Sequence, residues 1–359
     1  MLTRKTLKVV FVNLLLLFIG TLLLELIFGG WLSANRLNKL NLIRDVDLSY
    51  DVGDLYAAGN KQIRYKRDSF GLRGDYGTPG QIDLLTVGGS TTDQRFISEG
   101  STWQDVMQRE FATHGKTVRV ANAGVDGQST YGHIKNFDWW FPHIPNFKVR
   151  YFLFYIGDND FHKEANNEYD DLYERPNSTY GILKQWVKER SVFYHWYRTL
   201  KGISHARAGK IGHRAVNFQQ QQWVEAPGVT NHRELIGRRL PGYQQRLKIL
   251  DERVRQLGGL PVYVTQPTRR CKNLNGKTVG VAETETFEGV EINGVDSCIM
   301  MQTLNEKTME FCRSVGGICV DLASELEFED ADFYDFYHNT PRGGEKIGVY
   351  LYQKLQDRF

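Results

Sequence analysis

The sequence has little net charge and no repeats. With 45 Lys and Arg against 42 Asp and Glu, its formal net charge is only +3 over 359 residues, too small to indicate nucleic-acid binding. It contains neither an internal repeat nor a low-complexity tract, and its 13% aromatic content argues against a disordered protein. The glycine-rich turn Gly88–Ser90 lacks both the GxGxxG spacing and the lysine of a P-loop. The length therefore fits one large core with an insertion or two smaller cores, with only a weak indication of phosphate binding.

Cysteine is scarce and confined to one region. All four cysteines lie between Cys271 and Cys319, a pattern that suits one or two disulfides in an oxidising compartment. Zinc is less favoured because there is no CxxC pair and no histidine among them, and free buried thiols remain an alternative. Of the three possible pairings we favour Cys271 with Cys298 and Cys312 with Cys319.

The one long apolar run is at the N-terminus. Residues Val9–Trp31 are interrupted only by Asn13 and Glu25 and are numerous enough to cross a hydrocarbon layer. Basic residues precede the run: Arg4, Lys5 and Lys8. We expect residues 1–32 to form a cytoplasmic tip and transmembrane anchor, with the remaining chain extracytoplasmic, as in a bacterial inner-membrane protein facing the periplasm. A cleaved signal peptide is the alternative, although the run is long for one and no A-x-A site follows.

The lone Glu25 within this run has two interpretations. A single carboxylate in a span is usually tolerated or paired with another helix. It could therefore mark a partner helix.

Beyond a polar, turn-rich segment at 33–82, predicted as a stalk, strand and helix patterns alternate. Short apolar runs predict buried parallel strands at Leu84–Val87, Val118–Ala121, Tyr151–Ile156, Pro261–Thr265 and Gly317–Val320. Helical patterns occur at Trp103–His114, Gly242–Leu257, Gln302–Val315 and Gly343–Leu355. The alternation predicts a three-layer α/β/α domain over 83–359, doubly wound around a mostly parallel five-stranded sheet.

Small and amide-bearing residues follow three successive predicted strands. They are Gly88-Gly89-Ser90, the segment containing Gly124, and Gly157–Asp160 containing Asn159. Each could be ordinary turn or helix-cap chemistry. Because ligands of such sheets bind beyond the carboxyl ends of the strands, the three clusters are predicted to converge on one site.

Near the C-terminus, Asp335 precedes His338 by three residues, just before the last predicted helix. The pair could be a solvated acid and a surface histidine. Alternatively, the carboxylate could fix the imidazole tautomer, leaving the other ring nitrogen to take a proton from Ser90.

Together these four blocks resemble the SGNH hydrolases, also called the GDSL family, over most of 83–359 apart from an insertion at about 163–239. The resemblance implies that Ser90 is the nucleophile, His338 the general base and Asp335 its orienting acid. It further implies an oxyanion hole formed by the backbone N–H groups of Ser90 and Gly124 and the side-chain amide of Asn159. The segment "DSFGLRGD", 68–75, resembles the lead-in of membrane-anchored bacterial members. One departure is Gly89, where the family usually has Asp, which leaves open an altered role at this turn.

The insertion begins acidic and becomes basic and aromatic. It could lie on a lipid headgroup surface, cover a groove for an acidic glycan, or be a solvated helical insertion. No cofactor is implied, because Asp158 and Asp160 suit turn and cap hydrogen bonds. The histidines likewise lack metal-ligand spacing: His114, His133, His143 and His162.

These features predict a membrane-anchored extracytoplasmic serine esterase that removes acyl groups, with acetyl favoured, from a glycan or glycolipid. Nucleic acid is not an expected partner. One alternative is an O-acyltransferase that modifies a cell-surface polysaccharide with the same triad. A second is a non-catalytic glycan-binding scaffold.

Overall fold

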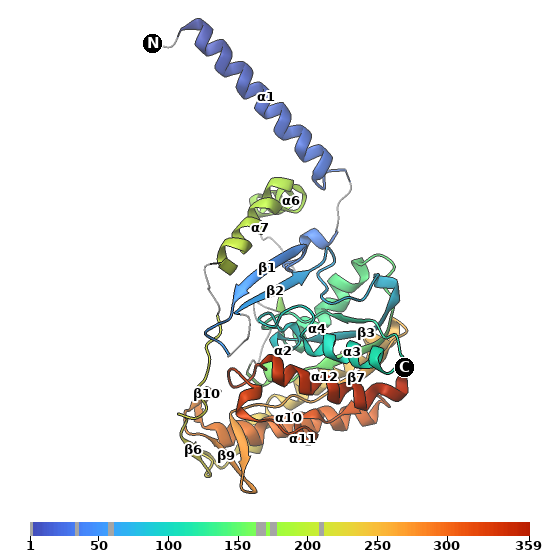
Figure 1. The fold of residues 1–359 in the computed structure, drawn as a ribbon, viewed down its shortest axis with the longest axis vertical. Coiled ribbons are helices and arrows are strands. Elements are labelled where there is room, and N and C mark those ends of the chain that lie inside the picture. The colour runs from blue at the N-terminus through green and yellow to red at the C-terminus, as the bar shows by residue number, and fades with distance from the viewer. Residues whose placement is uncertain (1–2, 33–35, 57–60, 163–169, 173–177, 208–211) are drawn as a thin grey trace. The chain divides into compact units, whose positions relative to one another are not determined.

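The computed structural model describes the chain except for residues 1–2, 33–35, 57–60, 163–169, 173–177 and 208–211. It divides into two compact units: residues 1–41 with 173–205, and residues 42–172 with 206–359 (Figure 1). Lys163, where the predicted insertion begins, lies outside the described residues. The insertion thus contributes to both units.

The first unit contains the predicted anchor. Helix α1, Arg4–Phe28, is long and apolar enough to cross a membrane, and its apolar window is not buried by other parts of the chain. A signal sequence near the N-terminus can meet the same criteria of length and apolar composition. Two further helices, α6 (Thr179–Arg190) and α7 (Val192–Arg207), come from the predicted insertion.

The second unit is built on a five-stranded parallel sheet of order β12-β7-β5-β3-β4. The strands are β3 (Ile82–Gly88), β4 (Val120–Asn122), β5 (Val149–Tyr155), β7 (Leu260–Val264) and β12 (Ile318–Val320). The predicted sheet is confirmed, and each predicted strand overlaps an observed one. The runs are almost wholly buried because both sheet faces are covered by helices.

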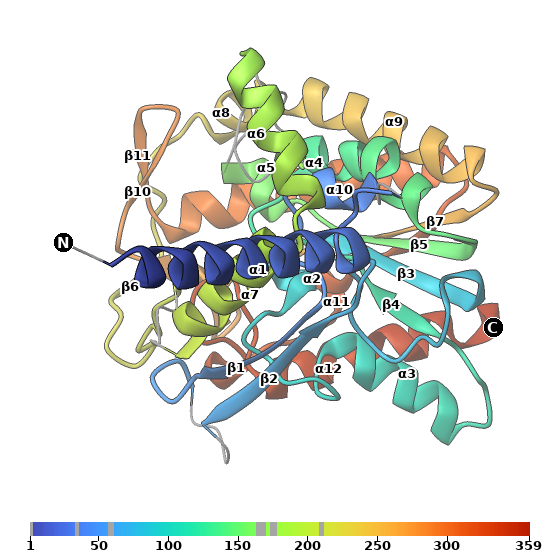
Figure 2. The same ribbon diagram turned by 90° about the horizontal axis from the view of Figure 1, so that it is seen from above.

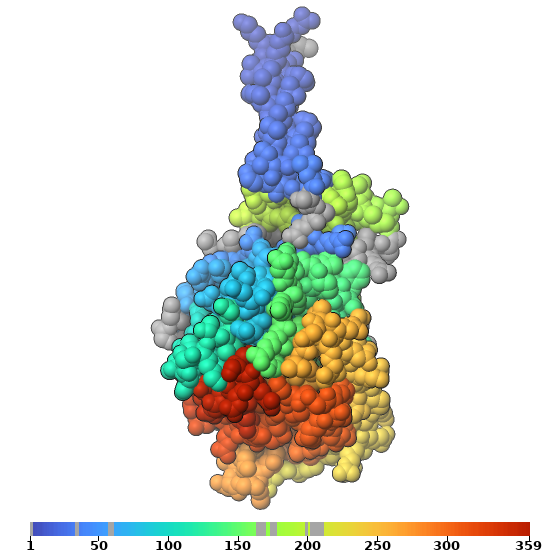
Figure 3. Space-filling model, turned by 90° about the vertical axis from the view of Figure 1, so that its right-hand side faces the viewer, coloured from blue at the N-terminus to red at the C-terminus, as the bar shows by residue number. Residues whose placement is uncertain are grey.

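Helices cover both faces of the sheet (Figure 2). Helices α3 (Trp103–Thr113) and α12 (Pro341–Leu355) pack together on one face, and the red C-terminal helix lies beside the teal α3 at the surface (Figure 3). Alternate side chains of the strands meet this pair in a buried core that includes Leu84, Leu153, Met107 and Leu351. The other face carries α4 (Thr130–Lys135), α9 (Leu240–Gln256) and α10 (Gly294–Ser314). The three-layer, doubly wound class predicted from the alternation is therefore observed.

Shorter elements complete this unit: α2 (Ser90–Asp93), α5 (Asp158–His162), α8 (His232–Gly237), α11 (Leu322–Glu325), β6 (Trp223–Val224), β8 (Cys271–Leu274), β9 (Lys277–Val281), β10 (Glu285–Phe287) and β11 (Val290–Ile292).

Helix α10 begins eight residues before the predicted Gln302. Asn293 and Asp296 form a capping box, in which each side chain accepts from the other residue's backbone N–H. This satisfies N–H groups that the first helical turn leaves unpaired. The helix can therefore begin at a glycine, Gly294, where the apolar periodicity is weak.

The segment predicted as a stalk differs from that expectation. It contains an antiparallel hairpin, β1 (Val46–Asp51) and β2 (Gln62–Arg67), and from Leu42 onward it belongs to the same compact unit as the sheet. The side chains of Tyr65 and Arg67 are buried. Its polar composition reflects buried ion pairs described below rather than a solvated linker.

Both favoured cysteine pairings are observed. Cys271 bonds to Cys298, which ties β8 to α10, and Cys312 bonds to Cys319, which ties the end of α10 to β12. These two disulfides account for all four cysteines of the sequence.

Candidate active site

The order of the sheet defines where a ligand would bind. Strand β4 lies on one side of β3 and β5 on the other. The chain therefore passes from β3 to β4 in one direction along the sheet and returns past β3 to β5 in the other. Parallel sheets of this kind bind ligands outside the carboxyl ends of the strands at such a switch point. Ser90 lies two residues after the end of β3 and Asn159 four residues after the end of β5, which brings two predicted site residues to this edge.

The turn between β3 and α2 is closely packed. A Cβ at Gly88 would lie 2.1 Å from Thr92 Oγ1, and a Cβ at Gly89 would lie 2.2 Å from Asn159 Nδ2. Any side chain at position 89, including the Asp usual in the resembled family, would displace the Asn159 amide. Glycine at position 89 therefore leaves room for the Asn159 side chain as this chain places it.

Ser90, His338 and Asp335 form a continuous hydrogen-bonded chain. Ser90 Oγ lies 2.7 Å from His338 Nε2, and His338 Nδ1 lies 2.8 Å from Asp335 Oδ2. Asp335 Oδ1 also accepts from the backbone N–H groups of Tyr337 and His338, at 2.9 and 2.7 Å. The turn therefore holds its own carboxylate against the imidazole, which favours the tautomer with the proton on Nδ1 and a lone pair on Nε2 facing Ser90.

Electrostatics around this chain favour a charged acid beside a basic imidazole. Burial alone would lower the pKa of His338, but the adjacent Asp335 and the more distant Asp158 and Asp126 outweigh it, and the net pKa is raised above the ordinary 6.5. Burial alone would raise the pKa of Asp335, but attraction to His338 and its hydrogen bonds lower it below 3.8. The imidazole is therefore a stronger base than a free histidine.

The predicted oxyanion donors differ in their environments. Asn159 donates one amide hydrogen to the carbonyl of Gln128 at 3.0 Å, leaving the second amide hydrogen. Gly124 N–H donates to Asn122 Oδ1 at 2.8 Å. A Cβ at Gly124 would lie 2.2 Å from Asp93 N, so glycine is needed here for close packing of the β4 loop against α2.

Behind the turn that carries Ser90 lies a buried cluster of charged residues that the sequence did not predict. The Asp93 carboxylate, at the end of α2, lies 2.7 Å from Arg67, 3.6 Å from Arg95 and 3.8 Å from Arg73. Tyr65 OH donates to the same carboxylate at 3.1 Å. Asp93 and Arg67 are 1% and 3% exposed. Burial alone would raise the pKa of Asp93, but attraction to its three arginine partners outweighs burial, and the net pKa lies below the ordinary 3.8.

This cluster links the lead-in segment to the site. Arg67 also donates to the carbonyl of Gly124, and Arg73 to that of Asp93. The arginines thereby fasten both loops that flank Ser90. The sequence pointed to this region only through the segment "GLRGD", which contains Arg73. The family resemblance assigned no role to that arginine.

His213, from the predicted insertion, covers one face of His338. The two ring centroids are 4.2 Å apart, and His213 Nδ1 lies 2.8 Å from Tyr334 OH. Burial, followed by the charge of His338, lowers the pKa of His213 to about 4. His213 is therefore a neutral neighbour at physiological pH, and no sequence motif singled it out.

His213, Asp335 and His338 place three potential metal-ligand atoms within 4.8 Å of one another. Each is already engaged: His338 with Ser90 and Asp335, and His213 with Tyr334. A metal ion at this position would have to break the serine–histidine–aspartate chain.

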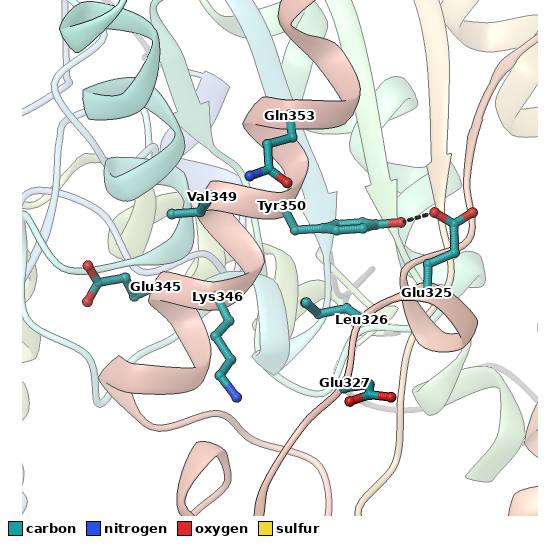
Figure 4. Close-up of a pocket in the computed structure, with 8 residues that line it drawn as sticks. All are labelled: Glu325, Leu326, Glu327, Glu345, Lys346, Val349, Tyr350 and Gln353. Carbon is teal, nitrogen blue, oxygen red and sulfur yellow. Dashed lines mark hydrogen bonds between the residues drawn. The ribbon is translucent and has the colours of Figure 1, made fainter.

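The recess beside Ser90 is small. It encloses about 10 Å³ and is lined by Ser90, Thr91, Gln94, Phe96, Ile97, Tyr334, His338 and Asn339. A larger pocket of about 530 Å³ lies between α11 and α12, where Tyr350 bonds Glu325 at 2.8 Å (Figure 4). None of the predicted site residues lines that larger pocket.

Fold and site together define a doubly wound α/β protein with a serine–histidine–aspartate hydrogen-bond chain at the carboxyl edge of its sheet. No known family profile matches the chain, and neither does any curated protein. Among solved structures, it is similar to a member of the lipolytic protein G-D-S-L family from Veillonella parvula, with 13% identity, 77% of this chain and 98% of the other covered, and a TM-score of 0.41. It is also similar to an acetylxylan esterase from Geobacillus stearothermophilus, with 11% identity, 78% and 95% coverage and a TM-score of 0.43. A GDSL-like lipase from Bacteroides thetaiotaomicron matches with 11% identity, 79% and 93% coverage and a TM-score of 0.39.

Proposed function

We propose that the protein is a serine ester hydrolase of the SGNH type, anchored to a membrane by α1 and acting outside the cytoplasm. The observation that carries the proposal is the continuous chain from Ser90 through His338 to Asp335, with heavy-atom distances of 2.7 and 2.8 Å. Both distances are within hydrogen-bond reach, as nucleophilic catalysis by an activated serine requires.

In the proposed reaction, His338 Nε2 takes the proton of Ser90 as Ser90 Oγ attacks the ester carbonyl. The C–O bond to the alcohol then breaks, and the imidazolium returns its proton to the leaving alcohol. Water attacks the acyl-enzyme in the same way, giving the free acid and restoring Ser90. Asp335 stabilises the imidazolium without itself becoming protonated.

Two donors support the developing oxyanion in this proposal. Ser90 is the first residue of α2, so its N–H has no partner within the helix. Asn159 supplies the amide hydrogen that is not donated to Gln128. Gly124 N–H would join them only by leaving or sharing its bond to Asn122; its main contribution is to the packing of the loop.

The small recess supports a short acyl group. Phe96, Ile97 and Tyr334 close the space beside Ser90 to about 10 Å³, about the volume of one water-sized probe. An acetyl group requires less rearrangement of these side chains than a long acyl chain. We therefore propose acetyl esters of a glycan or glycolipid as substrates.

The decisive experiment is active-site labelling of the full chain in detergent with a fluorophosphonate. Ser90→Ala should lose labelling and roughly 10⁶-fold in turnover of an acetyl ester, while the exposed Ser101→Ala should keep both. Unchanged thermal unfolding of Ser90→Ala would show that the loss is chemical. Labelling that persists in Ser90→Ala would refute the assignment of the nucleophile.

Product analysis tests the hydrolytic outcome. An acetylated oligosaccharide should yield free acetate and deacetylated sugar. Acetyl transfer to an added sugar acceptor without release of acetate would instead identify an acyltransferase.

A further inference from the structure

The exit end of α1 is joined to the junction between α6 and α7. Glu25 accepts hydrogen bonds from Ser191 Oγ at 2.6 Å, from Val192 N–H at 3.0 Å and from Trp31 Nε1 at 2.7 Å. Gly30 N–H donates to the carbonyl of Arg190 at 2.8 Å. The one acid in the apolar run is thus the N-terminal cap of α7, a favourable place for a carboxylate.

This junction fixes the depth of both helices if α1 crosses a membrane, as proposed above. Val9 to Phe28 would extend roughly 30 Å as helix, which matches the hydrocarbon thickness of a bilayer. The Glu25 contacts and the edge-on pair Trp31–Trp186, with centroids 5.1 Å apart, then lie at the far boundary. Tryptophan is enriched at that depth because its ring is amphipathic.

Helices α6 and α7 expose apolar side chains at helical spacing. The exposed set is Tyr180, Ile182, Leu183, Trp186, Val187, Trp196, Tyr197 and Leu200. Helix α7 has only 16 residues, fewer than the 17 or so needed to span a bilayer. A helix of this length with such a face lies along a surface rather than through it.

The same segment is strongly basic. Six basic residues occur between 179 and 207: Lys184, Lys188, Arg190, Arg198, Lys201 and Arg207. The single acid, Glu189, is buried and lies 3.8 Å from Lys39. Arg190 lies over the Trp186 ring at 4.9 Å, so a cationic and an aromatic side chain are in contact on α6.

We propose that α6 and α7 form an interfacial platform that lies in the headgroup layer of a membrane containing anionic phospholipid, on the side where α1 emerges. The aromatic and aliphatic side chains enter the acyl boundary, and the lysines contact phosphate. This inference rests on the anchoring role of α1 but not on the chemistry of Ser90. The hydrogen bonds and the ring contact that join α1 to α6 and α7 involve only residues 25–31 and 186–192, which belong to one compact unit.

The test uses the full chain in liposomes of phosphatidylcholine and phosphatidylglycerol in equal parts. Three variants, Leu15→Cys, Leu200→Cys and Leu274→Cys, replace exposed leucines in α1, α7 and β8 and are labelled with an environment-sensitive fluorophore. Lipids brominated near the headgroup or near the bilayer centre then report the depth of each label. Shallow bromine should at least halve the Leu200→Cys signal, deep bromine the Leu15→Cys signal, and neither the Leu274→Cys signal.

Charge is tested in the same system. Omitting phosphatidylglycerol, or replacing Lys184, Lys188 and Lys201 by Gln, should reduce shallow quenching at Leu200→Cys while leaving Leu15→Cys unchanged. A Leu200→Cys label that emits as if buried but is not quenched would show that α7 packs on protein, which overturns the proposal. If Leu15→Cys were unquenched by deep bromine, the anchor and the platform would both be wrong, whereas fluorophosphonate labelling of Ser90 in the same samples reports the esterase proposal separately.

Discussion

Two aspartates near Ser90, Asp335 and Asp93, have different charged partners. Asp335 shares its carboxylate with a neighbouring imidazole and two backbone N–H groups of its own turn. Asp93 is buried and shares its carboxylate with three arginines: the nearby Arg95, and Arg67 and Arg73 from the lead-in segment. The first partner can gain and lose a proton near neutral pH, whereas arginine cannot. In the proposed mechanism, therefore, Asp335 serves proton transfer, whereas Asp93 holds the turn that carries Ser90 in place.

The largest expected effect is on catalysis. Asp335→Asn keeps the size of the side chain but removes the charge that stabilises the imidazolium and selects its tautomer. Turnover of an acetyl ester should fall on the order of 10⁴-fold, with little change in the denaturant midpoint. Turnover that stayed near wild type would mean that Asp335, like Asp93, is structural.

The second expected effect is on stability. Asp93→Asn leaves the buried Arg67 and Arg73 and the half-buried Arg95 without their shared counter-charge, and breaking a buried ion pair in this way typically costs about 3–5 kcal/mol. Denaturant unfolding followed by circular dichroism measures this loss. The exposed pair Arg64–Asp47 offers a matched control, since Asp47→Asn should change stability by about 1 kcal/mol or less. A large loss of turnover by well-folded Asp93→Asn would assign it a chemical role.

The smallest expected effect is a difference in pH dependence in the wild type, between the activity that relies on His338 and Asp335 and the stability that relies on Asp93. Because the pKa of His338 is raised above 6.5, activity should decline as the pH falls through that raised value, where the base becomes protonated. The lowered pKa of Asp93 contributes stability that is present above its ordinary value of 3.8 and is lost only as the pH falls further, through the folded pKa. Activity and unfolding measured on one pH series should therefore show two separate transitions. A single coincident transition would show that acid inactivation is unfolding.

The contrast also explains what the sequence could predict. Ser90 and His338 lie in short blocks next to strand ends or the last helix, where local pattern and chain order place them. The strand and helix alternation likewise predicted the sheet, because burial on both faces leaves continuous apolar runs. These features depend on near neighbours in the chain.

The missed features depend on distant partners. Arg67 lies 26 residues before Asp93 in a segment whose polarity resembles that of a linker, and only the fold shows that its charge is buried. His213 lies in the insertion outside any motif, yet its ring contacts that of His338, with centroids 4.2 Å apart. The engagement of Gly124 N–H by Asn122 is a matter of local geometry that residue identity alone does not reveal.

The separation of Ser90 from His338 has a consequence for biosynthesis. The two residues are 248 positions apart, so at about 5–20 residues per second a ribosome needs roughly 12–50 s to reach the histidine after the serine. Throughout that interval the nascent chain carries a serine with no base beside it. In the proposed mechanism Ser90 needs this base, so ester cleavage can begin only after the ribosome has passed His338.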